Sequence, residues 1–490
     1  MTVLESVTRF LSGRRSGTRR NEIRRVERFS SSASFDADPN TGCIIEKRIV
    51  EPLTKCDVLV VGGGPAGLCA ALGAKRASRE LDVVILERFG CYGGVITHVG
   101  METVGWYRYA GTDDTEGIGR EMERLAQNLG ASQQWPYNDS HCLDTERFKC
   151  IADDLLTKEK VRCYLHCLVV DAILVDGKIA GVVTESKSGR KAVLAKRVVD
   201  CTGDADVAHR AGCEYSTVSP DRALGVSLVL NACGVNVPKF KQFTESNCKT
   251  YDDWNATPGW EQETSGKENG LKTPYLDLGG DIGGSWSGLS TDTGEATNLN
   301  LVHLKGYDAT NVEHLTKAEM EGRAGALEAI TRLRDTVPGF EKARLRNLAM
   351  TLGVRDTRKI KGIYDLTAHD VTRQARFDDA IGVFPEFVDG YNVLLLPTTG
   401  RAFELPYRAL VPPKINNLIV AGRCVSGDSV SHAATRNMMC CCVTGQAAGV
   451  AAATSLRLGL HTHDLKGPLV QAIQAALQDQ GAKVKAGERR

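Results

Sequence analysis

Residues 55–94 constrain the fold more than any other stretch of the chain. Residues 58–61 form a short apolar run rich in valine, as expected of a strand buried on both faces of a parallel sheet. Gly62, Gly64 and Gly67 follow at G-x-G-x-x-G spacing, and the apolar stripe of a helix comes next. The sequence therefore predicts a strand, a tight glycine turn and a helix N-terminus in succession.

Such a turn lets the backbone approach a pyrophosphate, because glycine has no side chain and a helix N-terminus offers free amide hydrogens. Pro65 and Ala66 stand in the first helical turn, where proline is tolerated. A second apolar run, residues 82–86, ends at Glu87, twenty residues after Gly67. At this spacing a dinucleotide fold brings a carboxylate to the ribose hydroxyls. We therefore expect a Rossmann-like, doubly wound α/β domain that binds a dinucleotide.

The loop after Glu87 reads Arg88-Phe-Gly-Cys-Tyr-Gly-Gly-Val-Ile-Thr. It resembles the flavin-side loop of FAD-dependent oxidoreductases. The resemblance extends from about residue 57 to about residue 458. It is to the family containing the flavin core of heterodisulfide reductase-like proteins, and more distantly to fumarate reductase flavoproteins. It implies FAD as the cofactor, with Arg88, Gly93, Gly94 and Thr97 beside it and the paired glycines beneath the flavin ring.

Residues 200–206, Asp-Cys-Thr-Gly-Asp-Ala-Asp, resemble the segment of this family that passes beside the FAD pyrophosphate. The resemblance implies that Gly203 and Asp204 lie at the FAD pyrophosphate. For Gly203, an ordinary strand-ending turn is the alternative. By the same resemblance Val169 lies near the adenine.

Residues 417–428 resemble the second FAD signature of these enzymes, and a helix of small residues follows. The resemblance implies that Gly422 brings the backbone close to the ribityl chain, that Arg423 lies at the cofactor and that Asp428 accepts from the ribityl hydroxyls. The N-terminus of the following helix is expected to face the flavin, where its dipole stabilises negative charge.

Between these signatures the pattern changes. Three apolar stretches within residues 161–199 predict a three-stranded meander. Loops are expected to dominate residues 239–270 and 279–297, and a helix is expected at residues 316–337. We interpret this middle region as a substrate domain inserted into a split FAD domain. The expected divisions are 1–34 (targeting segment), 55–225 (FAD domain, first part), 226–350 (inserted substrate domain), 351–460 (FAD domain, second part) and 461–490 (tail).

The resemblance gives positions near the flavin, and residue chemistry selects the candidate catalytic residues among them. Residues 352–362 resemble a family segment of the form Gly-x-Arg-x-x-Arg-x-Ile-x-Gly. If the segment is helical, Arg355 and Arg358 share a face and suit a carboxylate; a structural ion pair is the alternative. His98 and His432 each follow a flavin segment and are the candidate proton carriers. A core histidine with a satisfied hydrogen bond is the alternative for each.

Composition excludes several classes of function. No C-x-x-C pair occurs among the 16 cysteines, so iron–sulfur clusters and dithiol chemistry are not expected, and no metal site is predicted. No segment is expected to span a membrane, because the longest weakly charged window contains the glycine turn. Residues 1–28 carry eight arginines against three glutamates, which leaves the rest of the chain at about −4 from a total of +1. That remainder has no basic surplus for nucleic acid.

The basic first segment resembles a mitochondrial presequence that ends near residue 34. A mitochondrial matrix location is therefore expected. Its three glutamates oppose this interpretation, and a disordered basic tail on a cytoplasmic protein is the alternative.

These features predict an FAD-dependent oxidoreductase that transfers a hydride between a small organic substrate and the flavin. Carboxylate-bearing compounds are among the substrates considered. No second G-x-G-x-x-G follows a strand, so the electron acceptor is expected to be a second substrate, a quinone, an electron-transfer protein or oxygen. Two alternatives stay open: an electron-transfer subunit of a larger complex, and a non-redox binding protein that has kept the fold.

Overall fold

The computed structural model describes residues 34–37, 43–104, 115–134, 141–250, 274–391, 393–395, 400–465 and 467–487. The chain divides into two compact units, Met1–Val50 and Glu51–Arg490. In the first unit β1 (Ser34–Ala37) pairs antiparallel with β2 (Ile44–Lys47). The expected targeting segment lies, except for its last residue, outside the described residues.

The larger unit contains a seven-stranded sheet of order β7-β4-β3-β10-β9-β8, with β24 also paired to β10. Its strands are β3 (Glu51–Val61), β4 (Val83–Leu86), β7 (Arg162–Tyr164), β8 (Leu168–Val175), β9 (Lys178–Ser186), β10 (Gly189–Asp200) and β24 (Leu418–Val420). The pairs among β7, β4, β3, β10 and β24 are parallel, whereas β8, β9 and β10 form an antiparallel meander. The Rossmann-like α/β fold expected from the sequence is confirmed.

The side chains of β3 alternate between two cores. Val58 and Val60 pack with α2 (Pro65–Ala77) and α10 (Met438–Leu458), whereas Leu59 packs on the opposite face with the meander. Because both faces of the strand are covered, every residue at its C-terminal end is apolar.

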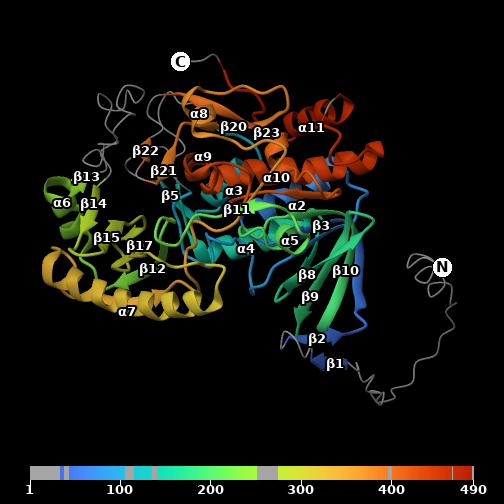
Figure 1. Cartoon of the computed structure of the whole chain (residues 1–490). Coiled ribbons are helices and arrows are strands. Elements are labelled where there is room, and N and C mark those ends of the chain that lie inside the picture. Colours follow the sequence, from blue (N-terminus) through green and yellow to red (C-terminus); the bar gives the residue numbers. More distant parts are fainter. Residues whose placement is uncertain are drawn as a thin grey trace, which may run out of the picture. The chain divides into compact units, whose positions relative to one another are not determined.

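Helices α2 and α10 lie side by side (Figure 1). A Cβ added at Gly445 would lie 2.1 Å from the carbonyl oxygen of Ala66, and one at Gly449 would lie 1.9 Å from that of Ala70. The two helices therefore touch through their backbones. Within the described residues α10 is the one helix long and apolar enough to cross a membrane, but 94% of that window is buried inside the protein, as in a core helix.

The larger unit contains further helices. They are α3 (Ile118–Asn128), α4 (Thr145–Lys158), α5 (Asp206–Arg210), α8 (Ala368–Thr372), α9 (Ser429–Thr435), α11 (Pro468–Asp479) and the 3-10 helix η3 (Tyr407–Leu410). The predicted meander is confirmed, except that its first stretch is divided between β7 and β8. His166, with φ of 56°, interrupts that stretch.

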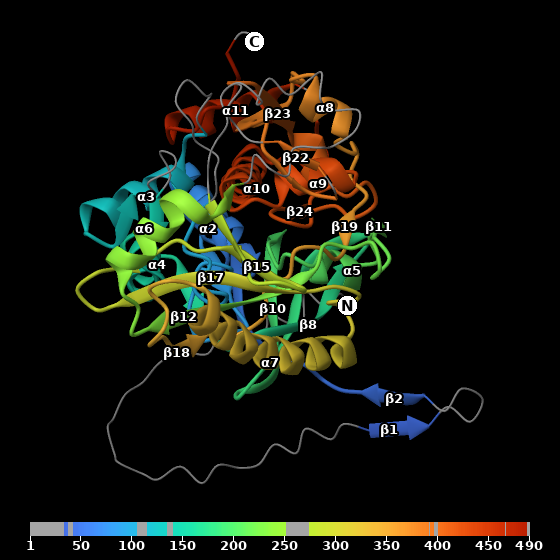
Figure 2. The same ribbon diagram turned by 90° about the vertical axis from the view of Figure 1, so that its left-hand side faces the viewer.

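A second seven-stranded sheet, of order β13-β14-β15-β17-β12-β18 with β16 paired to β17, occupies the middle of the chain. Its strands are β12 (Val226–Cys233), β13 (Lys249–Thr250), β14 (Pro274–Asp277), β15 (Ile282–Ser285), β16 (Leu289–Ser290), β17 (Glu295–Leu304) and β18 (Arg344–Leu348). The predicted helix is α7 (Val312–Thr336), which begins four residues earlier than expected, where Asn311 caps it. Figure 2 shows α7 packed across β12 and β17.

The expectation that loops dominate residues 239–270 and 279–297 is wrong for much of the described part. Residues 237–247 form α6 (Val237–Asn247), capped by Asn236, and β15 and β16 lie within the second range. Glycine suggested loops there, but a Cβ at Gly284 would lie 2.1 Å from the carbonyl oxygen of Asn300, so close strand packing requires it. Residues 251–273 lie outside the described part of the chain.

Four short strand pairs complete the described part of the unit. They are β5 (Ser132–Gln134) with β6 (His141–Leu143), β11 (Tyr215–Ser216) with β19 (Lys359–Ile360), β20 (Ala380–Pro385) with β23 (Ala402–Pro406), and β21 (Val388–Gly390) with β22 (Val393–Leu395).

Candidate functional site

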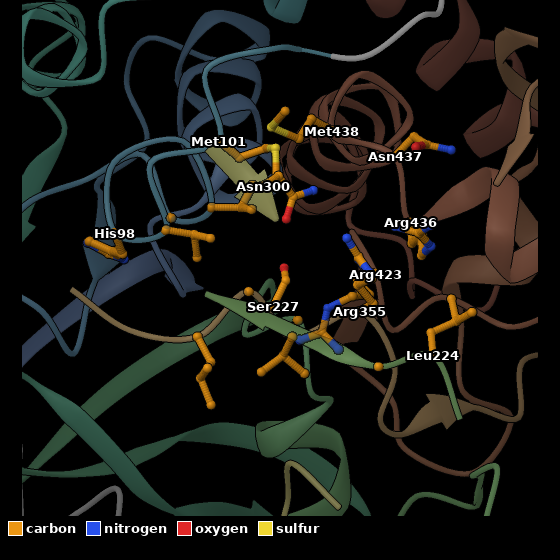
Figure 3. A pocket seen from close by; sticks show the side chains of 18 of the residues that line it. His98, Met101, Leu224, Ser227, Asn300, Arg355, Arg423, Arg436, Asn437 and Met438 are labelled. Atoms are coloured by element: carbon orange, nitrogen blue, oxygen red, sulfur yellow. The ribbon is translucent and has the colours of Figure 1, made fainter. Parts of the chain in front are cut away.

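A cavity of about 730 Å³ is lined by the carboxyl ends of the parallel strands and by the second sheet. The first sheet contributes the residues that follow β3, β4 and β10, and the second sheet contributes residues of β12, β14, β15 and β17. Residues 351–355 and residues 436–438 also line it, and Figure 3 shows several of their side chains. The predicted site residues in this lining are Gly62, Gly64, Pro65, Ala66, Glu87, Arg88, Gly94, His98, Gly203, Asp204, Arg355, Gly422 and Arg423.

The glycine turn joins β3 to α2 at one wall of the cavity. Gly62 has φ of 98°, and a Cβ there would lie 2.5 Å from the carbonyl oxygen of Cys201. A Cβ at Gly67 would lie 1.7 Å from the carbonyl oxygen of Gly62. By contrast, a Cβ at Gly64 would meet only Gly94 Cα, at 3.7 Å. Gly62 and Gly67 are therefore required for close packing, whereas Gly64 leaves open space beside the N-terminus of α2.

Glu87 follows β4 and is held against this turn. Its Oε2 accepts from the amide of Gly63 at 2.7 Å and its Oε1 from the amide of Phe89 at 2.9 Å. The side chain of Arg88 lies over the ring of Phe89, 4.8 Å from its centroid. The carboxylate is thus fixed at the turn, and each oxygen keeps a lone pair for a further donor.

The loop that follows packs on the turn. The amide of Gly93 donates to the carbonyl of Gly63 at 2.8 Å, and a Cβ at Gly94 would lie 2.6 Å from Gly64 Cα. Thr97 and Gly93 do not line the cavity: the Thr97 hydroxyl donates to the carbonyl of Tyr92 at 2.9 Å and closes the loop on itself. These two residues shape the loop, and Gly94 is the member of the pair that reaches the cavity.

His98 lies at the end of this loop and in the cavity lining. Its Nε2 lies 2.9 Å from the carbonyl oxygen of Cys91, and its ring contacts Phe89 edge-on at 4.5 Å. Because a carbonyl only accepts, Nε2 carries the proton and Nδ1 is the acceptor. Burial lowers the pKa of His98, which favours this neutral form.

A network of charged groups forms another wall of the cavity. Asp204 Oδ1 accepts from Arg423 Nη2 at 2.6 Å and from the Thr357 hydroxyl at 2.7 Å, while Arg423 Nη1 donates to that hydroxyl at 3.0 Å. Burial alone would raise the pKa of Asp204, but the Arg423 charge and these hydrogen bonds hold it below its ordinary value. Gly203 and Gly422, with φ of 80° and 86°, bring the two segments together.

Arg355 enters the cavity from the side of the second sheet (Figure 3). Its Nη1 lies 3.1 Å from Nδ1 of His303 on β17, and Nε2 of that histidine lies 3.1 Å from the carbonyl oxygen of Asn300. Burial and the charge of Arg355 lower the pKa of His303 to about 3. A neutral imidazole therefore fixes the direction of the guanidinium.

Arg358 is placed elsewhere. Residues 351–358 are not helical, so the condition under which it shares a face with Arg355 is not met. Its Nη1 donates to the carbonyl of Asp204 at 3.0 Å and lies 3.1 Å from Asp206 Oδ1, and its guanidinium lies over the ring of Tyr215. This is the structural ion pair that the sequence left as the alternative.

His432 also lies outside the cavity lining. It is 1% exposed, and its Nε2 lies 3.0 Å from the carbonyl oxygen of Arg355. Burial and the charge of Lys359 lower its pKa to about 3. A buried neutral histidine in this position supports the Arg355 backbone, which matches the core alternative.

Two predicted FAD ligands, Asp428 and Val169, do not reach the cavity either. Asp428 caps α9, accepting from the amide of Ser431 at 2.8 Å, and it accepts from the amide of Ala368 at 2.7 Å. Val169 is buried in the core of the meander, opposite Thr184 on β9.

Residues that sequence reasoning missed line the side of the cavity made by the second sheet. They include Ser227 on β12 and Asn298, Asn300 and His303 on β17. Arg436 and Asn437, between α9 and α10, were also missed and line the cavity. A signal for two of them was present: in β17 the polar residues 298 and 300 alternate with Leu299 and Leu301, both 0% exposed. That is the pattern of a strand with one face in a core.

The sequence model of the FAD dependent oxidoreductase family matches residues 57–477. Similar solved structures include a geranylgeranyl bacteriochlorophyll reductase-like protein from Thermoplasma acidophilum, at 14% identity over 87% of this chain and 84% of that chain, with a TM-score of 0.43. They also include p-nitrophenol 4-monooxygenase from Pseudomonas putida, at 12% identity over 87% and 85%, with a TM-score of 0.43.

A third is anhydrotetracycline hydroxylase from Streptomyces rimosus, at 12% identity over 87% of this chain and 68% of that chain, with a TM-score of 0.42. No curated relative matches the chain. The family match spans most of the sequence, so the protein belongs to the FAD-dependent oxidoreductase family.

Proposed function

We propose that this FAD-dependent oxidoreductase transfers a hydride between its flavin and a small organic substrate that bears a carboxylate. The observation that supports the proposal is the position of Arg355 in the same cavity as Gly64 and Glu87. A guanidinium stays charged at any working pH, and its paired N–H groups match the two oxygens of a carboxylate. His303 directs that guanidinium.

The residues of the cavity fit FAD. The space beside Gly64 accommodates a pyrophosphate, the N-terminus of α2 supplies amide hydrogens, and the fixed carboxylate of Glu87 has room for ribose hydroxyls. The residues proposed to hold it are Gly62, Gly64, Pro65, Ala66, Glu87, Arg88, Gly94, Gly203, Asp204, Gly422 and Arg423. FAD, when bound, accepts or supplies the hydride. From the resemblance of residues 88–97 to a flavin-side loop, we also propose kinship with heterodisulfide reductase-like proteins.

His98 is the residue we propose to accept the substrate proton. Of the two histidines predicted for this role, it is the one that lines the cavity. Its Nδ1 carries no proton while Nε2 donates to Cys91, so it has the form that a base requires. The two electrons then pass to a second substrate, a quinone, an electron-transfer protein or oxygen.

Anaerobic reduction of the bound flavin tests the proposal. We expect at least one carboxylate-bearing metabolite to bleach the flavin of the purified protein, and its amide or methyl ester to do so far more slowly. Equal rates for the acid and its uncharged derivatives would remove the carboxylate from the proposal. Failure of every small molecule to bleach the flavin would favour the electron-transfer role within a larger complex instead.

A further inference from the structure

Asn298 and Asn300 of β17 line the cavity, and the side-chain oxygen of each has no hydrogen-bond donor among the described residues. Asn298 is 2% exposed and Asn300 is 9% exposed, and both line the cavity. The Oδ1 atoms of both are buried and accept no hydrogen bond from the described residues. Leaving buried acceptors without donors destabilises a folded protein, so each such atom is expected to have a partner beyond the described residues.

The direction of the Asn298 amide follows from its neighbours. Thr297 and Ser287 both donate to Oε2 of Glu102, at 2.7 and 3.3 Å. The single proton of the Ser287 hydroxyl is used in that bond, so its oxygen accepts from Asn298 Nδ2, at 2.7 Å. The nitrogen end of the amide is therefore committed, and the oxygen end has no donor among the described residues.

The backbone at Asn298 holds this side chain in place. Its φ of 49° lies in the left-handed region, which asparagine tolerates better than most residues. Its amide donates to Oδ1 of Asn231 on the neighbouring strand β12, at 2.8 Å. A conformation of this kind persists where the surrounding structure enforces it, often at a ligand site.

Asn300 is linked to the proposed carboxylate site through one imidazole. Its carbonyl oxygen accepts from Nε2 of His303, whose Nδ1 accepts from Arg355. In Figure 3 the amide of Asn300 and the hydroxyl of Ser227 point toward the same open space. Asn300, Ser227 and the guanidinium of Arg355 therefore line the same cavity.

We propose that Asn298 and Asn300 form an acceptor subsite for an O–H or N–H group of the substrate whose carboxylate Arg355 holds. The substrate class is therefore a hydroxy acid or an amino acid rather than a plain carboxylic acid. This inference rests on the proposed function and narrows it.

Matched ligand sets test the subsite in the FAD-loaded, full-length protein. The sets are lactate, alanine and propionate; malate, aspartate and succinate; and phenyllactate, phenylalanine and 3-phenylpropionate. Each is titrated anaerobically while the flavin spectrum is recorded, and the half-saturating concentration is taken from the shift or bleaching. In at least one set we expect the hydroxy or amino acid to bind about 10-fold or more tightly than the unsubstituted acid. The member that shows the preference identifies the donor as a hydroxyl or an amino group.

Asn300→Leu, which is close in shape but has no amide, should bring that preference to about 1. Asn247→Leu, at an exposed position on α6, is the matched control and should keep it. Asn300→Asp retains an acceptor oxygen, so it should keep the ratio while weakening binding of every acid by repulsion. Asn300→Leu should also raise the unfolding temperature by about 1–2 °C, because it removes an unsatisfied oxygen.

The inference is overturned if the parent shows no preference in any set, or if Asn300→Leu preserves one. It is also overturned if Asn300→Leu purifies without flavin, since the oxygen would then serve the cofactor. Arg355→Lys separates this failure from that of the proposed function. If that variant weakens all acids equally while no preference exists, the carboxylate site stands and the acceptor subsite does not. If it weakens none, the proposed function fails as well.

Discussion

Nη1 of Arg355 lies 3.1 Å from Nδ1 of His303, and this contact determines the tautomer of a half-buried imidazole. A guanidinium only donates, so Nδ1 must accept and Nε2 must carry the proton that goes to the carbonyl of Asn300. Both ring nitrogens are then committed. His303 is accordingly a positioning residue for Arg355, and the proton transfer falls to another group.

Arg355→Lys should retain FAD but slow flavin reduction by the substrate about 10²–10³-fold, because an ammonium cannot supply the paired N–H groups. The measurement is the anaerobic reduction rate by stopped flow at saturating substrate. Arg358→Lys is the matched control, since Arg358 does not line the cavity and binds the backbone carbonyl of Asp204 and the carboxylate of Asp206. If both variants reduce flavin at the parental rate, Arg355 has a structural role and the substrate site lies elsewhere.

Gly64→Val should give a folded protein that purifies without flavin. Within the described residues its Cβ meets only Gly94 Cα, at 3.7 Å, so a defect in flavin content would come from the ligand. Gly67→Ala is the contrasting variant, because its Cβ would lie 1.7 Å from the carbonyl oxygen of Gly62 and should destabilise the fold itself. Circular dichroism reports folding, and the flavin absorbance relative to the protein absorbance reports cofactor content. A folded Gly64→Val protein with stoichiometric FAD would disprove the assignment.

Burial raises the pKa of Glu102 from 4.5 to about 7, although Thr297 and Ser287 donate to its carboxylate. Between these pH values the folded protein keeps a proton that the unfolded chain has lost. The contribution of this group to the free energy of unfolding is therefore complete below pH 4.5 and falls by about 3 kcal/mol as the pH rises to 7. Glu102→Gln should remove this dependence.

Urea denaturation of the parent and Glu102→Gln at several pH values from about 4.5 to about 8 measures the difference. The free energy of unfolding of Glu102→Gln, measured relative to that of the parent, should increase by about 3 kcal/mol between the first and the last pH. Glu245→Gln, at an exposed position on α6, should track the parent throughout. A constant difference between the parent and Glu102→Gln would show that Glu102 is ionised in the folded state across this range.

Gly449→Ala should destabilise the protein by about 3 kcal/mol or more, because its methyl group would lie 1.9 Å from the carbonyl oxygen of Ala70 and force the two helices apart. Gly459→Ala, just beyond α10, meets nothing within 4 Å and should cost only the left-handed backbone strain of about 1–2 kcal/mol at φ of 67°. Thermal unfolding compares them. Equal losses would mean that α10 can move away from α2 at little cost.

We propose that residues up to about 34 direct the protein to the mitochondrial matrix. A fluorescent protein fused to the C-terminus should colocalise with a matrix marker, and removal of residues 2–34 should leave it in the cytosol. A fusion with the leading arginines changed to glutamine serves as the charge control. Cytosolic fluorescence of the full-length fusion would support the alternative of a basic tail.

The parts of the fold that sequence reasoning found are those with local signals. The apolar run before Gly62, the turn itself and Glu87 lie within 30 residues of one another, and their spacing reports geometry directly. The carboxylate indeed lies at the turn, 2.7 Å from the amide of Gly63.

What sequence reasoning missed depends on contacts between distant segments. Arg358 is turned away from the cavity by Asp204, which is 154 residues earlier in the chain, and nothing in the local pattern distinguishes it from Arg355. Strands β15 and β16 of the second sheet were not predicted, because glycine-rich sequence is typical of loops. In the structure Gly284 instead allows close packing on β17. His303 was overlooked because a lone histidine in a strand has no spacing to interpret.

The backbone contact between α2 and α10 has a consequence for how the protein is made. The helix that follows the glycine turn, α2, leaves the ribosome about 360 residues before α10, which packs against it, and β24 is also synthesised late. At 5–20 residues per second, a nascent chain waits roughly 20–70 s with one face of its first helix uncovered. Because Gly422 and Arg423 of the cavity lining are also synthesised late, we expect flavin to be acquired late in biosynthesis and the exposed face of α2 to need shielding until translation is nearly complete.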